Sequence, residues 1–265
     1  MKKLTFLFIC FGFLAANATS WRVNNNPAID ADFSTFEAAV AGASAGDTLY
    51  MEGSNFTYGE CTLTKPLVII GPGFYLAEND STQVSNLEAN FEKFYIDSTA
   101  SGSQVYGCQF VADVRISGSN VIFARNWVYG ESGYGQGIFV GHDNDVVNCS
   151  IIQNFCNKIE GGYYSYEPVA HNTLIANNII YGSIDFNEYA TCVIYNNVVH
   201  TQVNVYNSII KNNIQYATGY GTYGFVENTG NIFEYNMTIQ PDIPSGTGNV
   251  TDIDPLEIFA DFEET

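Results

Sequence analysis

Short apolar runs recur along the chain, and a pair of residues ending in asparagine precedes most of them. The pattern is clear in three places and weaker in two: Asn177-Asn178-Ile179-Ile180, Asn196-Asn197-Val198-Val199, Asn212-Asn213-Ile214, Arg125-Asn126 and Tyr235-Asn236-Met237. The run Asn148-Cys149-Ser150-Ile151-Ile152 is a looser member. The second positions are separated by 19 residues from 178 to 197, 16 from 197 to 213, and 23 from 213 to 236. An irregular repeat of about twenty residues predicts a solenoid.

The residue types in this repeat indicate a β-solenoid, in which each coil contains short parallel strands and coils stack about 4.8 Å apart. Ile and Val fit the half-buried surface of such strands. An asparagine at a coil corner can bond its equivalents above and below and the turn backbone. An unpartnered buried amide costs about 1–3 kcal/mol, so the ladder must continue, and its expected members are Asn126, Asn178, Asn197, Asn213 and Asn236. Asparagine-rich surface turns in a β-sandwich are the alternative.

Alternation of polar and apolar residues predicts further strands between residues 104 and 123. Val114, Ile116, Val121 and Phe123 are expected to face the core. The polar run 117–120 between them predicts a turn.

A short helix is predicted within residues 30–46. Ser34-Thr35-Phe36-Glu37 has the pattern of a capping box, with Ser34 as N-cap and Glu37 three residues later. Phe36, Val40 and Ala43 then lie on one face. Such a helix is expected to cover the open end of the first coil, because terminal repeats of solenoids need caps.

The run FSTFEAAVAGASAGDTLYMEGSNFTYGECTLTKPLVIIGPGFYLAEN, together with the Asn-Asn-Ile repeats, resembles the secreted bacterial right-handed parallel β-helix proteins of the pectin-lyase-like superfamily. The resemblance covers nearly the whole mature chain. It implies an all-β, right-handed parallel β-helix with a capping helix, a Gly-Asp-Thr strand and a Gly-x-Gly turn. The superfamily includes lyases, hydrolases and adhesin stalks, so the resemblance is specific for the fold and not for an activity.

The chain divides into four expected segments. Residues 1–18 (MKKLTFLFICFGFLAANA) have a basic start, an apolar run and a small-x-small site, which is typical of a secretory signal peptide. Residues 19–46 carry the capping helix, 47–240 the β-helix, and 241–265 an exit loop and an acidic end. In the proteins it resembles, Asp-Pro-Leu is followed by a further segment, so the chain is expected to be a fragment. No later stretch is apolar enough for a membrane helix, and we expect a secreted or cell-surface protein.

The charge balance narrows the expected partners. Without Lys2 and Lys3, the mature chain has 7 basic and 28 acidic residues, a formal charge of 7 − 28 = −21. Such a chain repels nucleic acid and anionic membranes, and anionic polysaccharides unless a cation mediates. Solubility in a salty or calcium-bearing exterior is the alternative explanation of the charge.

Five cysteines remain after residue 18: Cys61, Cys108, Cys149, Cys156 and Cys192. Their spacing matches no metal-binding signature. Stacked core thiols are the main expectation, and a local disulfide between Cys149 and Cys156 is the alternative.

One polar group is a candidate for chemistry. Asp143 and Asp145 lie about one coil before Lys158 and Glu160, and alternation places the latter two on one face. A polysaccharide lyase of the pectate-lyase type needs a basic side chain and often Ca²⁺ held by carboxylates. A polar turn and a surface ion pair are the simpler interpretation.

Other catalytic and metal sites have weaker support. The Asn-Thr-Asp, Asp-Asp and Arg-x-Lys motifs of polygalacturonase-type glycosidases are missing, and a Gly-His pair ending at His142 is not enough. His142, His171 and His200 are spaced 29 residues apart, but isolated histidines are more often solvated than ligands.

Tyrosines near glycines are the stronger surface signal. Tyr163, Tyr164 and Tyr166 follow Gly161-Gly162, and the segments 129–134 and 216–225 have a similar composition. Tyrosine offers a flat ring with a polar tip, on which sugar rings stack, although these rings can also cover coil flanks. We therefore expect a glycan-associated protein that binds a polysaccharide or has a structural role. The alternatives are a cation-dependent polysaccharide lyase and an adhesin or spacer module without a small ligand.

Overall fold

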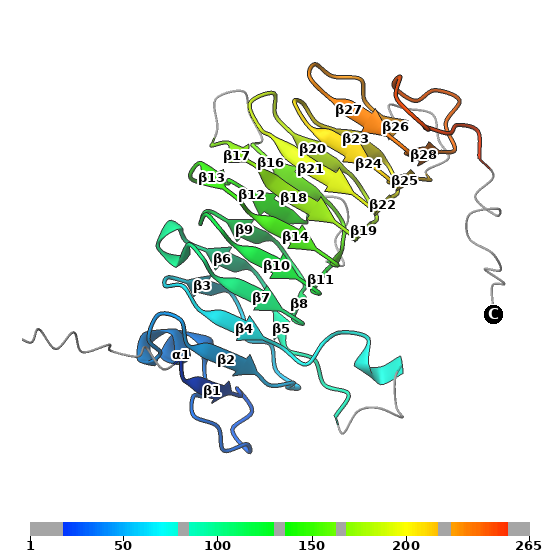
Figure 1. The fold of residues 1–265 in the computed structure, drawn as a ribbon. Coiled ribbons are helices and arrows are strands. Elements are labelled where there is room, and N and C mark those ends of the chain that lie inside the picture. Colours follow the sequence, from blue (N-terminus) through cyan, green and yellow to red (C-terminus); the bar gives the residue numbers. More distant parts are fainter. Residues whose placement is uncertain (1–17, 79–84, 130–135, 163–167, 217–223, 254–265) are drawn as a thin grey trace, which may run out of the picture.

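The computed structural model describes residues 18–78, 85–129, 136–162, 168–216 and 224–253. These form one column of stacked coils, with the N-terminal strands at one end and the last coils at the other (Figure 1). Three all-parallel sheets run along the column, and the chain visits them in turn. The predicted all-β parallel β-helix is confirmed. Among the described residues, none of the helices has the length and apolar composition that spanning a bilayer requires.

Sheet 1 has ten strands in the described part of the chain: β1 Ser20–Val23, β2 Thr48–Met51, β4 Val68–Ile70, β7 Gln104–Tyr106, β10 Ile122–Ala124, β14 Ser150–Ile152, β18 Thr173–Ala176, β21 Cys192–Tyr195, β24 Ile209–Lys211 and β27 Ile232–Glu234. Neighbours in this order are hydrogen-bonded. At the usual spacing, ten strands span about 43 Å along the column.

Sheets 2 and 3 each have eight strands within the described ranges. Sheet 2 contains β5 Asn90–Phe91, β8 Gln109–Phe110, β11 Trp127–Val128, β15 Phe155–Cys156, β19 Ile179–Ile180, β22 Val198–Val199, β25 Ile214–Gln215 and β28 Met237–Thr238. Sheet 3 contains β3 Cys61–Leu63, β6 Phe94–Ile96, β9 Val114–Ile116, β12 Ile138–Val140, β16 Ile159–Gly161, β20 Ile184–Phe186, β23 Gln202–Asn204 and β26 Gly224–Phe225. A short parallel pair, β13 Val146–Val147 and β17 Ala170–His171, lies between sheets 3 and 1 in chain order.

The core consists of inward side chains stacked in register from coil to coil. In sheet 1 the strand pairing aligns one inward row of ten residues. The row begins with Trp21, and its other nine members are buried: Leu49, Ile69, Val105, Phe123, Ile151, Ile175, Ile194, Ile210 and Phe233. Val114, Ile116, Val121 and Phe123 are all fully buried, as predicted. Stacking of like residues at the strand spacing explains why the apolar runs repeat.

The inward row of sheet 2 changes character along the column. It begins with Phe91 and Phe110, whose rings stack with centroids 5.3 Å apart. It ends with Gln215 and Thr238, both fully buried, with Thr238 Oγ1 donating to Gln215 Oε1 at 2.5 Å. Gln215 Nε2 donates to the backbone of His200 and Thr201. Apolar packing at the N-terminal end thus gives way to hydrogen bonds at the other end.

A ladder of buried asparagines runs along the corner between sheets 1 and 2. Each backbone N–H donates to the side-chain oxygen of the next member, and most amide groups donate to that oxygen as well. Each amide from Asn126 to Asn236 also donates to a strand carbonyl of the preceding coil. The members are Asn126, Asn154, Asn178, Asn197, Asn213, Asn236 and Asn249. The five predicted members all belong to it.

The residue before each ladder asparagine explains why asparagines come in pairs. It has a left-handed backbone, with φ between 54° and 57° in the coils that carry the six ladder members from Asn126 to Asn236. Asparagine tolerates this conformation better than most residues, and it fills the position as Asn177, Asn196 and Asn212. The first residue of each pair therefore turns the chain, and the second bonds to its neighbours.

The prediction for the loose member Asn148 was wrong. The ladder member of that coil is Asn154, preceded by Gln153 with φ 57°. Asn148 instead lies at the corner before sheet 1, in an exposed row where Asn148 Nδ2 donates to Asn120 and Asn172 Nδ2 donates to Asn148. All three have left-handed φ angles, so a second corner of the coil uses asparagine in the same way.

Helix α1 (Phe36–Gly42) lies at the N-terminal end of the column. Its N-cap is Thr35, whose Oγ1 accepts from Ala38 N at 3.2 Å, so the prediction of Ser34 was one residue off. Phe36 is fully buried against the rings of Phe91 and Phe94. The helix closes the apolar end of the core, as expected.

Asp47 joins the first strand to the turn after α1. Its carboxylate accepts from Thr19 N at 2.8 Å, Ser44 N at 2.9 Å and Trp21 Nε1 at 3.0 Å. These bonds, led by that from Thr19, lower the pKa of Asp47. The Gly-Asp-Thr sequence thus has a physical role in fixing β1 beside β2.

The five cysteines Cys61, Cys108, Cys149, Cys156 and Cys192 are all buried and free. The alternative of a disulfide between Cys149 and Cys156 is therefore wrong. Burial raises the pKa of each thiol, that of Cys192 to about 12. They pack as small apolar residues.

Replacing one ladder member tests the role of this corner. Asn197→Ala leaves the buried N–H of Asn178 without its acceptor and removes bonds to Ile175 and Asn213. We expect a loss of about 3 kcal/mol in the free energy of unfolding in urea. The control Asn196→Gly keeps the left-handed turn and should change stability by less than about 0.5 kcal/mol. Equal effects of the two changes would contradict the ladder's role.

The Asp47 carboxylate should make stability depend on pH. Because its folded pKa lies below the ordinary value of 3.8, its contribution is complete above that value and disappears as pH falls through the lower folded value. Asp47→Ala should therefore lower the urea midpoint at pH 7, and the difference from wild type should shrink below about pH 4. Urea denaturation of both proteins at pH 7 and below about pH 4 measures this difference in midpoint. A constant difference would show that the carboxylate's charge is not involved.

Candidate functional site

Lys158 and Glu160 lie on the outer face of sheet 3, on the same side of the chain as predicted. Lys158 Nζ donates to Glu160 Oε1 at 2.8 Å, and both side chains are about 15% exposed. The Lys158 ammonium also lies 4.9 Å from the ring centroid of Phe139. The second oxygen of Glu160 is buried and has no hydrogen-bond partner. The pair is thus a compact, mostly buried group.

Asp143 and Asp145 occupy the turn after β12. Asp143 accepts from Ser117 Oγ at 3.1 Å and lies 2.9 Å from His142 Nδ1. The bond with His142, more than that with Ser117, lowers the pKa of Asp143. Asp145 Oδ1 accepts from Val169 N at 2.7 Å. Within the described ranges, no hydrogen bond or ion pair joins these carboxylates to Lys158 or Glu160.

A shallow depression of about 310 Å³ lies beside Asp143, near the carboxyl ends of strands in sheet 3. Its lining includes Tyr95, Asp97 and Ser117. Arg115 lies beside this tyrosine, with its guanidinium 5.5 Å from the ring centroid of Tyr95 and 3.4 Å from Asp113. Sequence reasoning identified Asp143 here but missed Tyr95 and Arg115, which belong to earlier coils and meet it only through stacking.

The described residues contain no group of three or more His, Cys, Asp and Glu side chains that could hold a metal ion. The three histidines lie at different places around the coil. His142 contacts Asp143, His171 is exposed in β17, and His200 follows β22 in sheet 2. Equal spacing in sequence therefore does not bring them together.

The predicted binding tyrosines Tyr163, Tyr164 and Tyr166 lie outside the described residues. A different set of rings gathers on the outer face of sheet 2. Trp127 projects from β11, with Tyr75 4.7 Å and Tyr129 6.1 Å away between ring centroids. Phe155 from the next coil lies 6.2–6.5 Å from Tyr75, Tyr129 and Trp127.

The rings continue in later coils. Tyr181 and His200 stack at 5.0 Å with an angle of 16° between planes, and His200 lies 4.9 Å from Tyr216. The N–H of each of these three residues donates to a backbone carbonyl of the preceding coil, as Tyr181 N does to Cys156 O. The three residues therefore occupy equivalent positions in successive coils. We define the aromatic surface as Trp127, Tyr129, Phe155, Tyr181, His200 and Tyr216, and the Tyr75 ring from a neighbouring loop lies against its first member.

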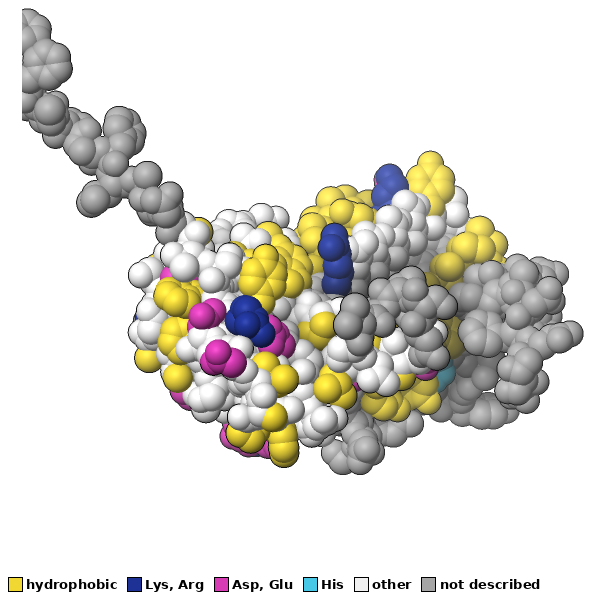
Figure 2. All heavy atoms as spheres, turned by 90° about the horizontal axis from the view of Figure 1, so that it is seen from below, with side chains coloured by type: hydrophobic (Ala, Val, Ile, Leu, Met, Phe, Trp, Pro, Cys, Tyr) yellow, Lys and Arg dark blue, Asp and Glu magenta, His cyan; other side chains and the backbone are white. Residues whose placement is uncertain are grey.

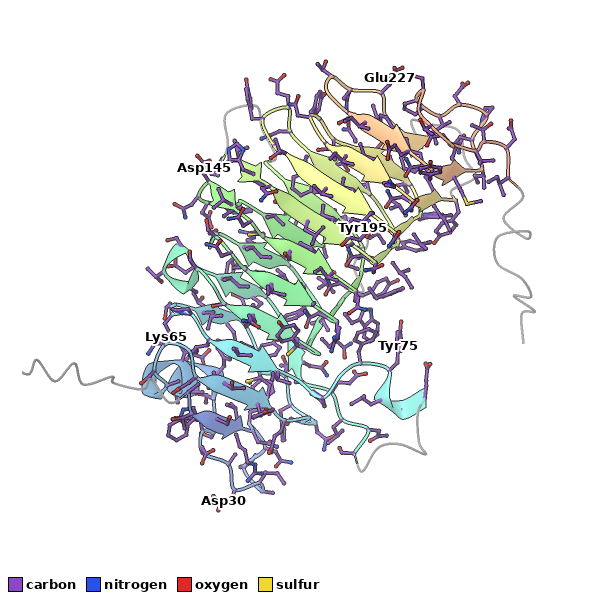
Figure 3. All side chains as sticks on the ribbon, in the orientation of Figure 1. Asp30, Lys65, Tyr75, Asp145, Tyr195 and Glu227 are labelled. Carbon is purple, nitrogen blue, oxygen red and sulfur yellow. The ribbon has the colours of Figure 1, made fainter. Side chains whose placement is uncertain are left out.

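The aromatic surface is partly open to solvent, and the outward rows of sheet 2 that carry its rings contain no Asp, Glu, Lys or Arg from β8 to β28 among the described residues. A carboxylate lies beside it, that of Glu88, which accepts from Tyr75 N. Tyr75, Tyr129 and Tyr181 are 36%, 39% and 48% exposed. Tyr75 and Asp145 lie on opposite sides of the column (Figure 3), so this surface is separate from the polar turn of Asp143. On the face shown in Figure 2, hydrophobic side chains lie in patches between polar atoms, and Lys and Arg are sparse.

The sequence contains a pattern that corresponds to this surface. The first and third residues after a ladder asparagine point outward from sheet 2, and aromatic residues recur at these positions as Trp127, Tyr129, Phe155, Tyr181 and Tyr216. Tyr75 carries no such signal, because it comes from the loop after β4.

Comparisons of the chain with protein-family models, with curated proteins and with solved structures find no match.

Proposed function

We propose that this protein binds a neutral polysaccharide along the aromatic surface of sheet 2. The observation that carries the proposal is the row of aromatic rings that follows the column from Trp127 to Tyr216. Sugar rings present flat C–H faces to aromatic side chains, and their hydroxyl groups bond to polar tips such as the tyrosine O–H. An extended solenoid face suits a polymer.

The charge distribution favours a neutral ligand. The two outward rows of sheet 2 hold no Asp, Glu, Lys or Arg from β8 to β28 in the described residues. The chain as a whole has a formal charge of −19, which disfavours approach of a polyuronate. A neutral glycan meets neither repulsion nor an unpaired charge here.

Binding has more support than lyase chemistry. A lyase base must take a proton from the substrate, but the candidate basic groups already donate to carboxylates. Lys158 donates to Glu160, and Arg115 donates to Asp113. The carboxylates expected to hold a cation, Asp143 and Asp145, instead accept hydrogen bonds from Ser117 Oγ and Val169 N.

We further propose that the chain is an exported member of the pectin-lyase-like superfamily. The three-sheet parallel coil, the N-terminal helix and the buried asparagine ladder support membership. Export rests on the leader-like residues 1–18, of which 1–17 lie outside the described residues. An extracellular location is where polysaccharide ligands occur.

Removing one ring should weaken binding without affecting the fold. Tyr181→Ala removes an exposed ring that stacks on His200, and we expect about a tenfold loss in affinity for the preferred glycan. Affinity electrophoresis in gels containing mixed-linkage β-glucan, xylan, mannan or polygalacturonate measures this. The control Tyr189→Ala removes a ring of similar exposure (53%) outside sheet 2 and should have no effect.

Three results would contradict the proposal. Equal losses from both tyrosine changes would show that the aromatic surface has no special role. Absence of retention on every polysaccharide would leave a spacer or adhesin role, and retention on polygalacturonate alone would favour the polar face of sheet 3.

A further inference from the structure

Tyr75 lies against the ring of Trp127 although the two residues come from different coils. Tyr75 lies in the loop after β4, just before the short helix Leu76–Glu78. Its ring centroid is 4.7 Å from that of Trp127, with 30° between the planes. The described ring pairs within the aromatic surface itself are farther apart, at 4.9–6.5 Å. A ring of the chain itself therefore lies where a flat ligand ring would pack on the indole.

The backbone holds Tyr75 there in an unfavourable conformation. Its φ angle is 55°, a left-handed value that is uncommon for a bulky residue and that Tyr235 adopts at a ladder corner. The Tyr75 N–H donates to Glu88 Oε1 at 2.8 Å, which fixes the turn. Conformations of this kind persist where surrounding contacts impose them, and they are frequent at ligand clamps and switches.

Trp127 carries a donor that the closed arrangement leaves unused. Its Nε1 is buried and has no hydrogen-bond partner. A buried indole N–H normally finds an acceptor, and an unpaired one is costly. The other tryptophan of the chain follows the rule, because Trp21 Nε1 donates to Asp47.

From these observations we infer that Trp127 is the principal ring-binding residue of the aromatic surface and that Tyr75 occupies its face in the free protein. The inference rests on the proposed function. When a glycan binds, a sugar ring replaces the Tyr75 ring on Trp127, and a sugar hydroxyl accepts from Trp127 Nε1. Because only molecules with Tyr75 displaced are competent, the apparent affinity equals the intrinsic affinity multiplied by that fraction.

Three substitutions test the displacement. Tyr75→Asn keeps a residue that tolerates the left-handed turn but removes the ring, and we expect about 3- to 10-fold tighter binding of mixed-linkage β-glucan or xylan. Tyr75→Phe keeps the ring and should bind like wild type. Trp127→Ala should lose binding, and should do so equally when combined with Tyr75→Asn.

Tryptophan fluorescence gives a readout that needs no glycan. The chain has two tryptophans, and Trp21 lies in β1 away from Tyr75, so it contributes a constant background. Acrylamide should quench Tyr75→Asn more strongly than wild type or Tyr75→Phe, because the indole face becomes accessible. Adding glycan to Tyr75→Asn should restore protection.

The outcomes separate this inference from the proposed function. If wild type binds a glycan and Tyr75→Asn binds equally or more weakly, Tyr75 belongs to the binding surface and displacement is wrong. Unchanged acrylamide quenching in Tyr75→Asn would also overturn it. If no variant binds any neutral glycan, the proposed function itself fails, whatever the quenching shows.

Discussion

The structure depends on one constraint: every buried amide at the corner between sheets 1 and 2 must find its partner in the next coil. Asn178 illustrates it, since its N–H and amide both donate to Asn197, and its amide also reaches the carbonyl of Ile151 in the coil before. These bonds set the rotation of each coil relative to its neighbours. Once the corner is fixed, the inward residues of the three sheets fall into register, and the apolar rows of the core follow.

The same constraint organises the surface. Because the chain leaves each ladder asparagine in the same direction, the residues one and three positions later always point outward from sheet 2. Substitutions at these positions can add rings to a continuous surface without disturbing the core. The turns elsewhere are free to vary in length, and the steps along the ladder range from 13 to 28 residues. A regular scaffold thus presents both a periodic surface and irregular loops.

The fold was predictable from sequence because its repeat depends on residue identity. Asn178, Asn197 and Asn213 follow another asparagine and precede Ile or Val, so they were found. Asn154 was missed because Asn148, a few residues earlier, precedes the apolar pair Ile151-Ile152 and resembles the repeat more closely. The helix cap was off by one residue because Ser34 and Thr35 are chemically equivalent caps, and only the backbone decides between them.

The candidate site was less predictable. Lys158 directly precedes β16 and Glu160 lies within it, so alternation was enough to place both residues on one face. The contact between Tyr75 and Trp127 joins a loop to a strand in another coil, and no local pattern encodes the path of that loop. Asp143 and Tyr95 likewise line one depression only because their coils stack.

The change of the core from phenylalanine to glutamine and threonine gives the column a direction of assembly. The end containing Phe91 and Phe110 combines a helix cap with the densest aromatic packing, so it is suited to form first. Gln215 and Thr238 satisfy their polar groups only against an adjacent coil that already exists. Each completed coil is then the template for the next, and a chain that emerges with its N-terminus first can fold as it appears. Such vectorial growth exposes just one unfinished edge at a time to other chains, which limits misassembly.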